Sequence, residues 1–162
     1  GCDNQPMKFE QYSDKYKKQF EDAFVDYFID DLGAPLPEEG VRTKVVSSFR
    51  ELNAKGVAPT ILAIDDEGGL AGFVIFQIDS EKSDWNDRPG WGFIRECHVN
   101  KGWRRRGVGT ALVTIACNVM KQSGAAEAYL TTEKDFEFWE HAGFTRTGEQ
   151  APNGGEVLTK KL

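Results

Sequence analysis

The sequence has few cysteines, two histidines and no long apolar run. Its three cysteines, Cys2, Cys97 and Cys117, lie far apart and include no CxxC pair, which argues against a disulfide framework and against a zinc site. No stretch approaches the roughly 18 uninterrupted apolar residues of a membrane-spanning helix. The first residues, GCDNQPMKFEQ, lack the basic and then apolar pattern of a secretion signal. We therefore expect a cytoplasmic protein that binds neither a metal nor a membrane.

The composition indicates one globular domain. A chain of 162 residues buries roughly two-thirds of its unfolded surface on folding. The apolar content of 40%, with eleven Phe and four Trp, excludes a disordered chain. We expect a single domain over residues 1–162. Met7 is a candidate native start, in which case residues 1–6 are a remnant added ahead of it, and the sequence leaves this open.

The net charge of −6 is spread unevenly along the chain. Acidic residues outnumber basic ones before position 104, whereas three arginines follow one another at 104–106. Because an acidic chain repels the phosphates of nucleic acids, we expect no nucleic-acid binding. The excess of acid favours either a cationic partner or simply a solvated surface.

The first half of the chain predicts one strand, two helices and a hairpin. The candidate N-cap Ser13 opens a stretch with aromatic residues three and four apart, which is typical of an amphipathic helix. Two β-branched runs joined by DEGG are typical of an antiparallel hairpin. We predict a strand at 7–12, a helix from Ser13 to Gly33, a second helix ending at Gly56, and two strands within 59–80.

The second half predicts four strands and two helices. The first of these helices places Leu112, Ile115, Ala116 and Val119 at helical spacing, so we expect these side chains to face the core. The order of elements favours one α/β or α+β domain with a mixed sheet. We predict a strand at 91–99, a helix at 107–124, a strand at 126–131, a short helix from 136 that Gly143 stops, and strands at 144–149 and 157–162.

The stretch HVNKGWRRRGVGTAL, residues 98–112, places three arginines and two glycines at the start of a predicted helix. Unpaired backbone N–H groups and the helix dipole attract phosphate there, and Gly107 and Gly109 let the backbone approach an anion closely. The pattern is neither a dinucleotide fingerprint, which needs glycine where Leu112 stands, nor a P-loop, which needs Lys after its second glycine. We expect this turn to bind a pyrophosphate.

Residues 99–109, VNKGWRRRGVG, resemble the strand-turn-helix signature of the GNAT acetyltransferase superfamily. Arg104, Gly107 and Gly109 match its (Arg/Gln)xxGx(Gly/Ala) turn, and FEFWEHAGF at 136–144 is similar to its second signature. The predicted order of elements is also that of the family. The resemblance implies a mixed, mostly antiparallel sheet flanked by helices, acetyl-CoA as donor, an amine as acceptor, and a V-shaped opening between the fourth and fifth strands.

The same resemblance implies where coenzyme A is held. The end of the fourth strand pairs with the pantetheine arm and polarises the acetyl carbonyl through a backbone N–H; its residues are Cys97, His98 and Val99. The turn holds the pyrophosphate, mainly through backbone amides; its residues are Arg104, Arg105, Arg106, Gly107, Val108, Gly109 and Thr110. Thr132 stands where the family often has a cofactor-binding asparagine, and Trp139 is placed beside the pantetheine or in the core.

An amine must lose a proton before it attacks a thioester, which requires a general base. Strand alternation places Ile94, Glu96 and His98 on one face. Glu96 lies where the family often has an acidic residue, so we predict that Glu96 is the base, with its pKa raised by an apolar cleft. An ion pair with Arg95 or another surface base is the alternative role for Glu96. His98 is the second candidate for the base, and a structural hydrogen-bond donor near the turn is its alternative role.

The resemblance provides no acid for the departing thiolate. Trp139 stands where the family has a tyrosine, and an indole cannot deliver a proton at useful pH. Either the thiolate leaves unprotonated or takes its proton from water, or another group such as Tyr129, on the preceding strand, supplies it. Cys97 has no histidine and acid on its face of the strand, so we predict direct transfer in a ternary complex without an acetyl-cysteine intermediate. We expect Phe138 to lie in the core.

Acidic residues of the first helix and of the loop before the fourth strand favour a cationic acceptor, either a small molecule or an amine on a protein. The sequence also allows a homodimer. It allows two other functions. One is a catalytically silent acyl-CoA-binding module on the same fold, which Trp139 supports, and the other is a nucleic-acid-binding protein that uses the arginines at 104–106 and whose binding depends steeply on salt. The acidic residues are Asp22, Asp26, Asp30, Asp31, Asp84 and Asp87.

Overall fold

The computed structural model describes residues 6–162. Cys2 and residues 1–5 of the expected remnant lie outside the described residues. Within 6–162, no helix is both long and apolar enough to cross a membrane. The order of elements agrees with the sequence prediction, apart from short 3-10 and π segments. The elements are β1 (Met7–Gln11), η1 (Asp14–Tyr16), α1 (Lys17–Val25), η2 (Asp26–Asp31), α2 (Glu38–Gly40), η3 (Val41–Val46), α3 (Ser47–Ala54), β2 (Thr60–Asp65), β3 (Leu70–Ile78), β4 (Gly92–Val99), η4 (Lys101–Trp103), α4 (Val108–Gln122), β5 (Glu127–Thr132), α5 (Phe136–His141), β6 (Thr145–Gln150) and β7 (Glu156–Lys161).

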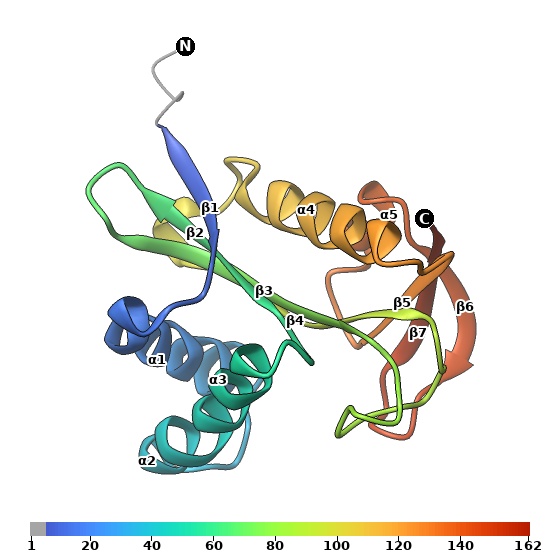
Figure 1. The fold of residues 1–162 in the computed structure, drawn as a ribbon, viewed down its shortest axis with the longest axis horizontal. Coiled ribbons are helices and arrows are strands. Elements are labelled where there is room, and N and C mark those ends of the chain that lie inside the picture. Colours follow the sequence, from blue (N-terminus) through green and yellow to red (C-terminus); the bar gives the residue numbers. More distant parts are fainter. Residues whose placement is uncertain (1–5) are drawn as a thin grey trace.

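The seven strands form one sheet in the order β1-β2-β3-β4-β5-β7-β6 (Figure 1). Neighbouring strands are antiparallel, except for β4 and β5, which are parallel. The strands β2 and β3 form the predicted hairpin, and Gly68 in its turn has a φ of +83°. The sheet is therefore mixed and mostly antiparallel, as the sequence predicts.

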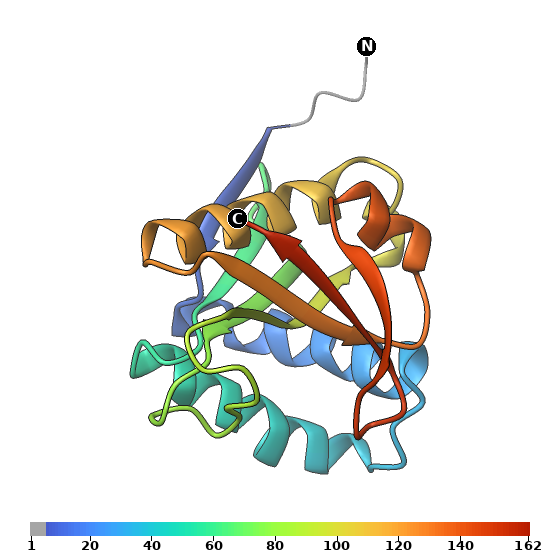
Figure 2. The same cartoon turned by 90° about the vertical axis from the view of Figure 1, so that its right-hand side faces the viewer.

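Helices cover both faces of the sheet (Figures 1 and 2). The helices α4 and α5 lie on one face, and α1, α2 and α3 lie on the other (Figure 1). Each layer has its own apolar core. Leu112 and Trp139 belong to the cluster under α4, whereas Phe20, Phe24 and Phe73 belong to the cluster under α1. The strand β3 contributes to both clusters and forms the buried centre of the molecule.

The predicted helix from Ser13 to Gly33 consists of three helical segments in succession. Ser13 has the extended backbone of an N-cap residue, but its side chain makes no capping hydrogen bond. The helix α1 passes into η2, a π-helical turn in which the N–H of Leu32 donates to Tyr27 O at 3.0 Å. Gly33 then ends the helix with a φ of +67°.

The inward face of α4 is rotated slightly from the predicted one. Leu112 and Ala116 are fully buried, as expected. Val119 is half-buried and packs against the core, and Ile115 is only half-buried. The buried stripe passes through Val113 and Cys117 instead. The prediction for Ile115 is therefore wrong, because a helix with apolar residues on most of its sides does not reveal its rotation about its own axis.

The loop before β4 is held in place by the buried carboxylate of Asp79. This carboxylate accepts hydrogen bonds from the side chain of Gln77 at 2.8 Å, from the backbone N–H groups of Asp87 at 3.1 Å and Arg88 at 3.0 Å, and from the hydroxyl of Tyr129. Although it is rich in polar turn residues, this loop is fixed to the sheet at several points.

Candidate functional site

The strands β4 and β5 separate after two residue pairs. They pair only at Gly92 with Ala128 and at Phe93 with Tyr129. Beyond that point β4 continues to Val99 with β3 on one side and, within residues 6–162, no strand on the other (Figure 1). The opening expected between the fourth and fifth strands is therefore present, and it leaves backbone groups on one edge of β4 available to a ligand.

An irregularity in β4 sets the direction of its side chains. Phe76 pairs with Ile94 and Ile75 pairs with Glu96, so Arg95 is an extra residue in β4, a β-bulge. The predicted alternation is therefore wrong for Ile94. Its side chain lies in the core under α4, whereas the side chain of Glu96 points toward η2 on the opposite face.

Arg95 connects this bulge to the loop before β4. Its guanidinium donates to Gln77 Oε1 at 2.9 Å and to the carboxylate of Asp84, and it lies 5.0 Å from the centre of the Phe49 ring. The ion pair that was the alternative role for Glu96 is thus made by Asp84. This leaves the Glu96 carboxyl without a basic partner.

The opening forms a cleft of about 640 Å³. The end of η2, the edge of β4, the start of α4, the end of β5 and the loop between β6 and β7 surround it. In the described part of the chain, no group of three or more His, Cys, Asp or Glu side chains is arranged to hold a metal ion. The predicted site residues that line the cleft are Glu96, Cys97, His98, Val99, Arg104, Gly109, Thr132 and Trp139.

The predicted glycine-arginine turn leads from η4 into α4. Gly107 has a φ of +80°, with no atom within 4 Å of where a Cβ would lie, and Arg105 has a φ of +63°. The first turn of α4 is closed by the N–H of Ala111, which donates to Gly107 O at 3.0 Å. The N–H groups of residues 108–110 therefore have no partner within the helix, and this end of α4 is suited to an anion.

Gly109 allows α5 to pack against α4. A Cβ at this position would lie 3.2 Å from two ring atoms of Phe138 and 3.4 Å from a methyl carbon of Val99. Phe138 packs at the edge of the core and lines the cleft, whereas Trp139 is buried, edge-on to both Phe138 and Phe144. The prediction that Phe138 lies in the core is therefore only partly right, and Trp139 is the more buried of the two.

One of the three consecutive arginines lines the cleft. Arg104 donates to a β4 carbonyl oxygen at 2.9 Å and to the carboxylate of Asp31 at 2.8 Å, whereas Arg105 and Arg106 extend into solvent. Lys134, in the turn after β5, donates to Asp31 O at 2.8 Å. Asp31, at the end of η2, therefore joins the two walls of the cleft.

The carboxyl group of Glu96 lies in the cleft beside η2. The hydroxyl of Tyr27 donates to Glu96 Oε2 at 2.5 Å. Burial raises the pKa of Glu96 to about 7, although the hydrogen bond from Tyr27 and the charge of Arg95 both act to lower it. Near neutral pH the carboxyl is thus divided between its acid and base forms, as a general base requires.

Tyr27 was not among the predicted site residues. Burial and the charge of Glu96 raise its pKa well above the ordinary value, and the backbone amide of Cys97 acts in the opposite direction. In the sequence, Tyr27 shares helical spacing with Phe24 and Phe28, which is typical of a core residue. The one signal of a polar role is a hydroxyl on an otherwise apolar face.

His98 lines the cleft, but its side chain is almost fully buried against η2. Its Nδ1 lies 3.3 Å from Asp31 Oδ2. Burial lowers the pKa of His98 to about 4, although Asp31 acts to raise it. The imidazole is therefore neutral at pH 7. This arrangement favours a structural role for His98 over a role as the base.

Cys97 and Thr132 also line the cleft, but their side chains are poorly suited to catalysis. Burial raises the pKa of the Cys97 thiol to about 12, so it stays protonated and is a poor nucleophile. The hydroxyl of Thr132 donates to Lys134 O at 2.6 Å. At Cys97 in particular, the backbone is the part that a ligand can use.

Tyr129 does not reach the cleft. It is 1% exposed, its hydroxyl donates to Asp79 and accepts from the indole N–H of Trp85 at 3.1 Å, and its ring stacks on Phe93. Burial and the hydrogen bond to Asp79 raise its pKa. The structure therefore does not support Tyr129 as the substitute acid, because its hydroxyl serves the loop before β4.

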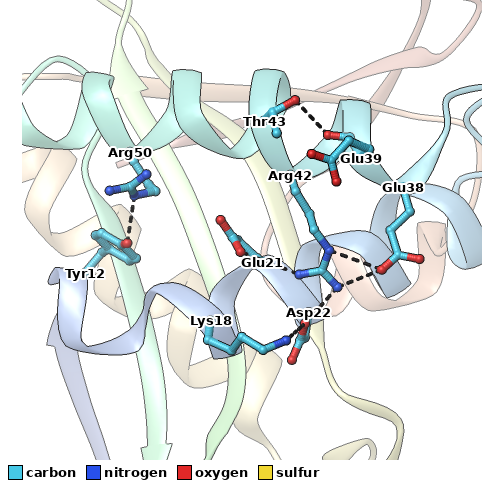
Figure 3. Close-up of polar contacts among 9 residues, drawn as sticks. All are labelled: Tyr12, Lys18, Glu21, Asp22, Glu38, Glu39, Arg42, Thr43 and Arg50. Atoms are coloured by element: carbon cyan, nitrogen blue, oxygen red, sulfur yellow. Dashed lines mark hydrogen bonds and ion pairs between the residues drawn. The ribbon is translucent and has the colours of Figure 1, made fainter.

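Several of the acidic residues expected to attract a cation are paired within the fold. Asp22 lies 2.8 Å from the guanidinium of Arg42 and 3.3 Å from Nζ of Lys18, in a network that joins α1 to α2 and η3 (Figure 3). The carboxylates at 31 and 84 are paired with arginines as described above. Asp26 and Asp30, by contrast, are exposed on η2.

Comparisons with known proteins agree with this architecture. Residues 9–144 match the sequence profile of the Acetyltransferase (GNAT) family, and a comparison with curated protein sequences gave no match. The PaiA N-acetyltransferase of Thermoplasma acidophilum, crystallised with coenzyme A, has a TM-score of 0.74 and 14% identity, over 97% of this chain and 99% of that chain. A GNAT-family acetyltransferase of Staphylococcus aureus Mu50 has a TM-score of 0.76 and 13% identity, over 97% and 99%. The NatC complex bound to Gag peptide and CoA has a TM-score of 0.68 and 19% identity, over 96% and 98%.

The profile match covers most of the chain, and it includes both the glycine-arginine turn and the second signature at 136–144. The solved structures share the whole fold at low sequence identity. The match over residues 9–144 shows that the chain belongs to the GNAT family of acetyltransferases.

Proposed function

We propose that this protein transfers an acetyl group from acetyl-CoA to a primary amine, directly and within a ternary complex. The observation that carries the proposal is Glu96, a carboxyl group in the cleft with a pKa of about 7 and a hydrogen bond of 2.5 Å from Tyr27. Such a group can accept a proton from an amine near neutral pH.

Acetyl-CoA is the co-substrate of this family, and the cleft fits it. The edge of β4 from Cys97 to Val99 has no strand partner on the cleft side within the described residues, and the left-handed Gly107 leads into an open helix end. We propose that this edge holds the pantetheine arm, and that the backbone N–H groups of residues 105–110 hold the pyrophosphate beside Arg104. When bound, the coenzyme supplies the acetyl group as a thioester.

The backbone N–H of Cys97 is proposed to polarise the acetyl carbonyl. It lies one residue beyond Glu96, on the strand edge that faces the cleft. A fixed donor aimed at an oxygen that gains negative charge is worth about 3 kcal/mol in the transition state. Because the donor is a backbone group, the path of β4 after the bulge at Arg95 matters more than the side chain at position 97.

For the acceptor, we propose an amine on a cationic small molecule or on a protein. The exposed Asp26 and Asp30 of η2 support a cationic acceptor, and the pairing of Asp22, Asp31 and Asp84 within the fold weakens that support. A peptide amine fits the same chemistry. We also retain the cytoplasmic location and the homodimer as predictions, which cell fractionation and sedimentation equilibrium would test.

The alternative function is a silent acyl-CoA-binding module, for which the buried Trp139 at the expected position of the acid is the supporting observation. The two functions differ in turnover. Calorimetry with acetyl-CoA should show binding in either case. Release of free thiol, followed with a disulfide reagent across a panel of small amines, polyamines, amino sugars and peptides, should occur only if the protein is an enzyme.

With the best acceptor, we expect Glu96→Gln to lower kcat by about 10² to 10⁴-fold and to leave the affinity for acetyl-CoA nearly unchanged. In the unaltered protein, kcat/KM should rise with pH around a midpoint near 7. Glu81→Gln, in the exposed loop before β4, is the matched control and should behave as the unaltered protein. Equal activity of Glu96→Gln would remove Glu96 as the base.

A further inference from the structure

Transfer to an amine releases a thiolate. The two residues considered above as its proton donor, Trp139 and Tyr129, are unsuitable. Trp139 has no proton to give at useful pH, and Tyr129 is buried outside the cleft. We propose that Tyr27 is the acid: its hydroxyl delivers a proton to the departing sulfur and regains one from Glu96. This inference rests on the proposed acetyl transfer and adds a catalytic residue to it.

The ring of Tyr27 is held firmly. Its centre lies 5.6 Å from that of Phe24, 5.7 Å from that of Phe73 and 5.3 Å from that of His98. The π-helical hydrogen bond to its own carbonyl oxygen adds an extra residue to the turn, and such turns are frequent at functional sites. The ring is therefore packed among aromatic side chains, while the residue also lines the cleft.

The hydroxyl of Tyr27 lies beside the proposed base, at 2.5 Å from Glu96 Oε2. Tyr27, Glu96 and Cys97 all line the cleft. Cys97 belongs to the edge of β4 proposed to hold the acetyl end of the coenzyme. Tyr27 thus adjoins the base and lines the cleft that the thioester is proposed to occupy.

The hydrogen bond between Tyr27 and Glu96 can reverse its direction. While Glu96 is ionised, the phenol donates its hydrogen to the carboxylate. Once Glu96 has taken a proton, the carboxylic acid can donate to the phenol oxygen, and the phenol hydrogen becomes free to point into the cleft. Protonation of Glu96 therefore frees the hydroxyl hydrogen of Tyr27 for transfer.

The atoms and charges balance. A C–N bond forms and a C–S bond breaks; the nitrogen loses one proton to Glu96, the sulfur gains one from Tyr27, and the proton on Glu96 passes to the phenol oxygen. Both side chains end as they began, and no further reactant is needed. The proton that an ammonium form of the acceptor loses before attack leaves to solvent.

Other ionisable groups near the phenol do not offer a competing route. Arg95 is bonded to the loop before β4, and Cys97 keeps its proton because burial raises its pKa to about 12. His98 is neutral at pH 7, and its Nδ1 lies 3.3 Å from the carboxylate of Asp31, which accepts a hydrogen bond from Arg104. The proposed proton path therefore runs through the pair that Tyr27 forms with Glu96.

The first test needs no enzymatic activity. Labelling the tyrosine Cζ atoms with ¹³C gives one signal for each of the four tyrosines, and Tyr27→Phe assigns one of them. We expect the Tyr27 signal to move with a midpoint near pH 7, as Glu96 titrates and the hydrogen bond reverses, and this step to vanish in Glu96→Gln. A Tyr27 signal that does not change between about pH 5 and 9 would overturn the proposal.

The second test uses the amine with the fastest turnover. We expect Tyr27→Phe to lower kcat on the order of 10²-fold at every pH, with the dissociation constant of acetyl-CoA unchanged. Tyr16→Phe removes the hydroxyl of another buried tyrosine just before α1, away from the cleft, and should leave kcat unchanged.

The pH profile separates an acid from a residue that only adjusts Glu96. In the latter case, loss of the hydrogen bond raises the Glu96 pKa and the full rate returns at higher pH; that result, or an unchanged kcat, contradicts the proposal. If the unaltered protein acetylates no amine, the proposed function fails, and the NMR titration still decides whether Tyr27 and Glu96 exchange a proton.

Discussion

Glu96 and His98 lie two residues apart on one strand, yet burial shifts their pKa values in opposite directions. Desolvation disfavours the anionic form of a carboxyl group, so the pKa of Glu96 rises to about 7, and it disfavours the cationic form of an imidazole, so the pKa of His98 falls to about 4. Tyr27 and Arg95 oppose the shift of Glu96, and Asp31 opposes that of His98, whereas the charge of Arg104 adds to it. In each case desolvation prevails, and the cleft tends to keep both groups uncharged.

The raised pKa of Glu96 has a cost in stability that can be measured. Between about pH 4.5 and 7 the folded chain binds more protons at Glu96 than the unfolded chain, so the free energy of unfolding falls as pH rises through this window. Glutamine resembles the protonated carboxyl. We therefore expect Glu96→Gln to exceed the unaltered protein in stability by about 1–3 kcal/mol at pH 8, with little difference at pH 4.5, in urea denaturation.

Glu81→Gln should show no such pH-dependent gain, because that carboxyl is exposed. If the stability curves of Glu96→Gln and the unaltered protein run parallel from pH 4.5 to 8, Glu96 does not have a raised pKa in the folded state. The choice of Glu96 as base would then lose its main support.

At the scale of elements, the regular parts of the fold were predictable because each depends on local chemistry. The hairpin and the helix ends at Gly33 and Gly56 were predicted correctly, and both of these glycines have positive φ. The bulge at Arg95 and the π-helical turn after Tyr27 were not. Each adds one residue locally, and each is stabilised by packing against another element, which apolar spacing along the chain does not reveal.

The candidate site was predictable in its backbone and less so in its side chains. A glycine at 107 and a turn into a helix are local signals. Tyr27, however, meets Glu96 across 69 positions of sequence, and Asp31 meets Lys134 across 103. Residues so far apart in the sequence meet only once the sheet has assembled, so no short sequence pattern could have indicated these contacts.

The contact between α4 and α5 leads to a prediction about Gly109. Alanine is favoured over glycine within a helix by roughly 1 kcal/mol, but a Cβ here would lie 3.2 Å from the Phe138 ring. We expect Gly109→Ala to destabilise the protein by about 1 kcal/mol and to stabilise it when Phe138→Ala is also present. Urea denaturation of the four proteins of this double-mutant cycle would measure the coupling.

Gly107→Ala is the contrasting control. The site is open, but its φ of +80° strains any residue with a Cβ, so the loss of about 1 kcal/mol should be the same with or without Phe138→Ala. An effect of Gly109→Ala that is equally independent of Phe138 would mean that the close approach of the two helices does not limit this position.

At the scale of the whole molecule, the sheet has two parts with little backbone pairing between them. The strands β1 to β4 form one part, and β5, β7 and β6 form the other. Two residue pairs join them. The core under α4 compensates, because it draws Ile94 from β4, Leu130 from β5 and Leu158 from β7 into one cluster. The cleft therefore lies at the boundary between the two parts of the sheet.

A ligand bound in the cleft between the two parts of the sheet should stabilise the entire fold. Coenzyme A at 100 times its dissociation constant adds about 2.7 kcal/mol to the free energy of unfolding, which corresponds to a rise in Tm of about 5–10 °C for a chain of this size. Thermal unfolding with increasing coenzyme would show it. Glu96→Gln should show the same rise, because Glu96 is proposed to act on the amine; an unchanged Tm for both proteins would argue against the cleft as the coenzyme site.

The last strands pair out of their order along the chain. Because β7 lies between β5 and β6, the strand β6 has no hydrogen-bonded neighbour in the sheet without it. On the ribosome, where residues emerge one after another, β6 must therefore wait until residues 156–161 have left the exit tunnel. A nonsense codon at Glu156 would leave β5 and β6 with open edges, and we expect cellular proteases to degrade that shortened product.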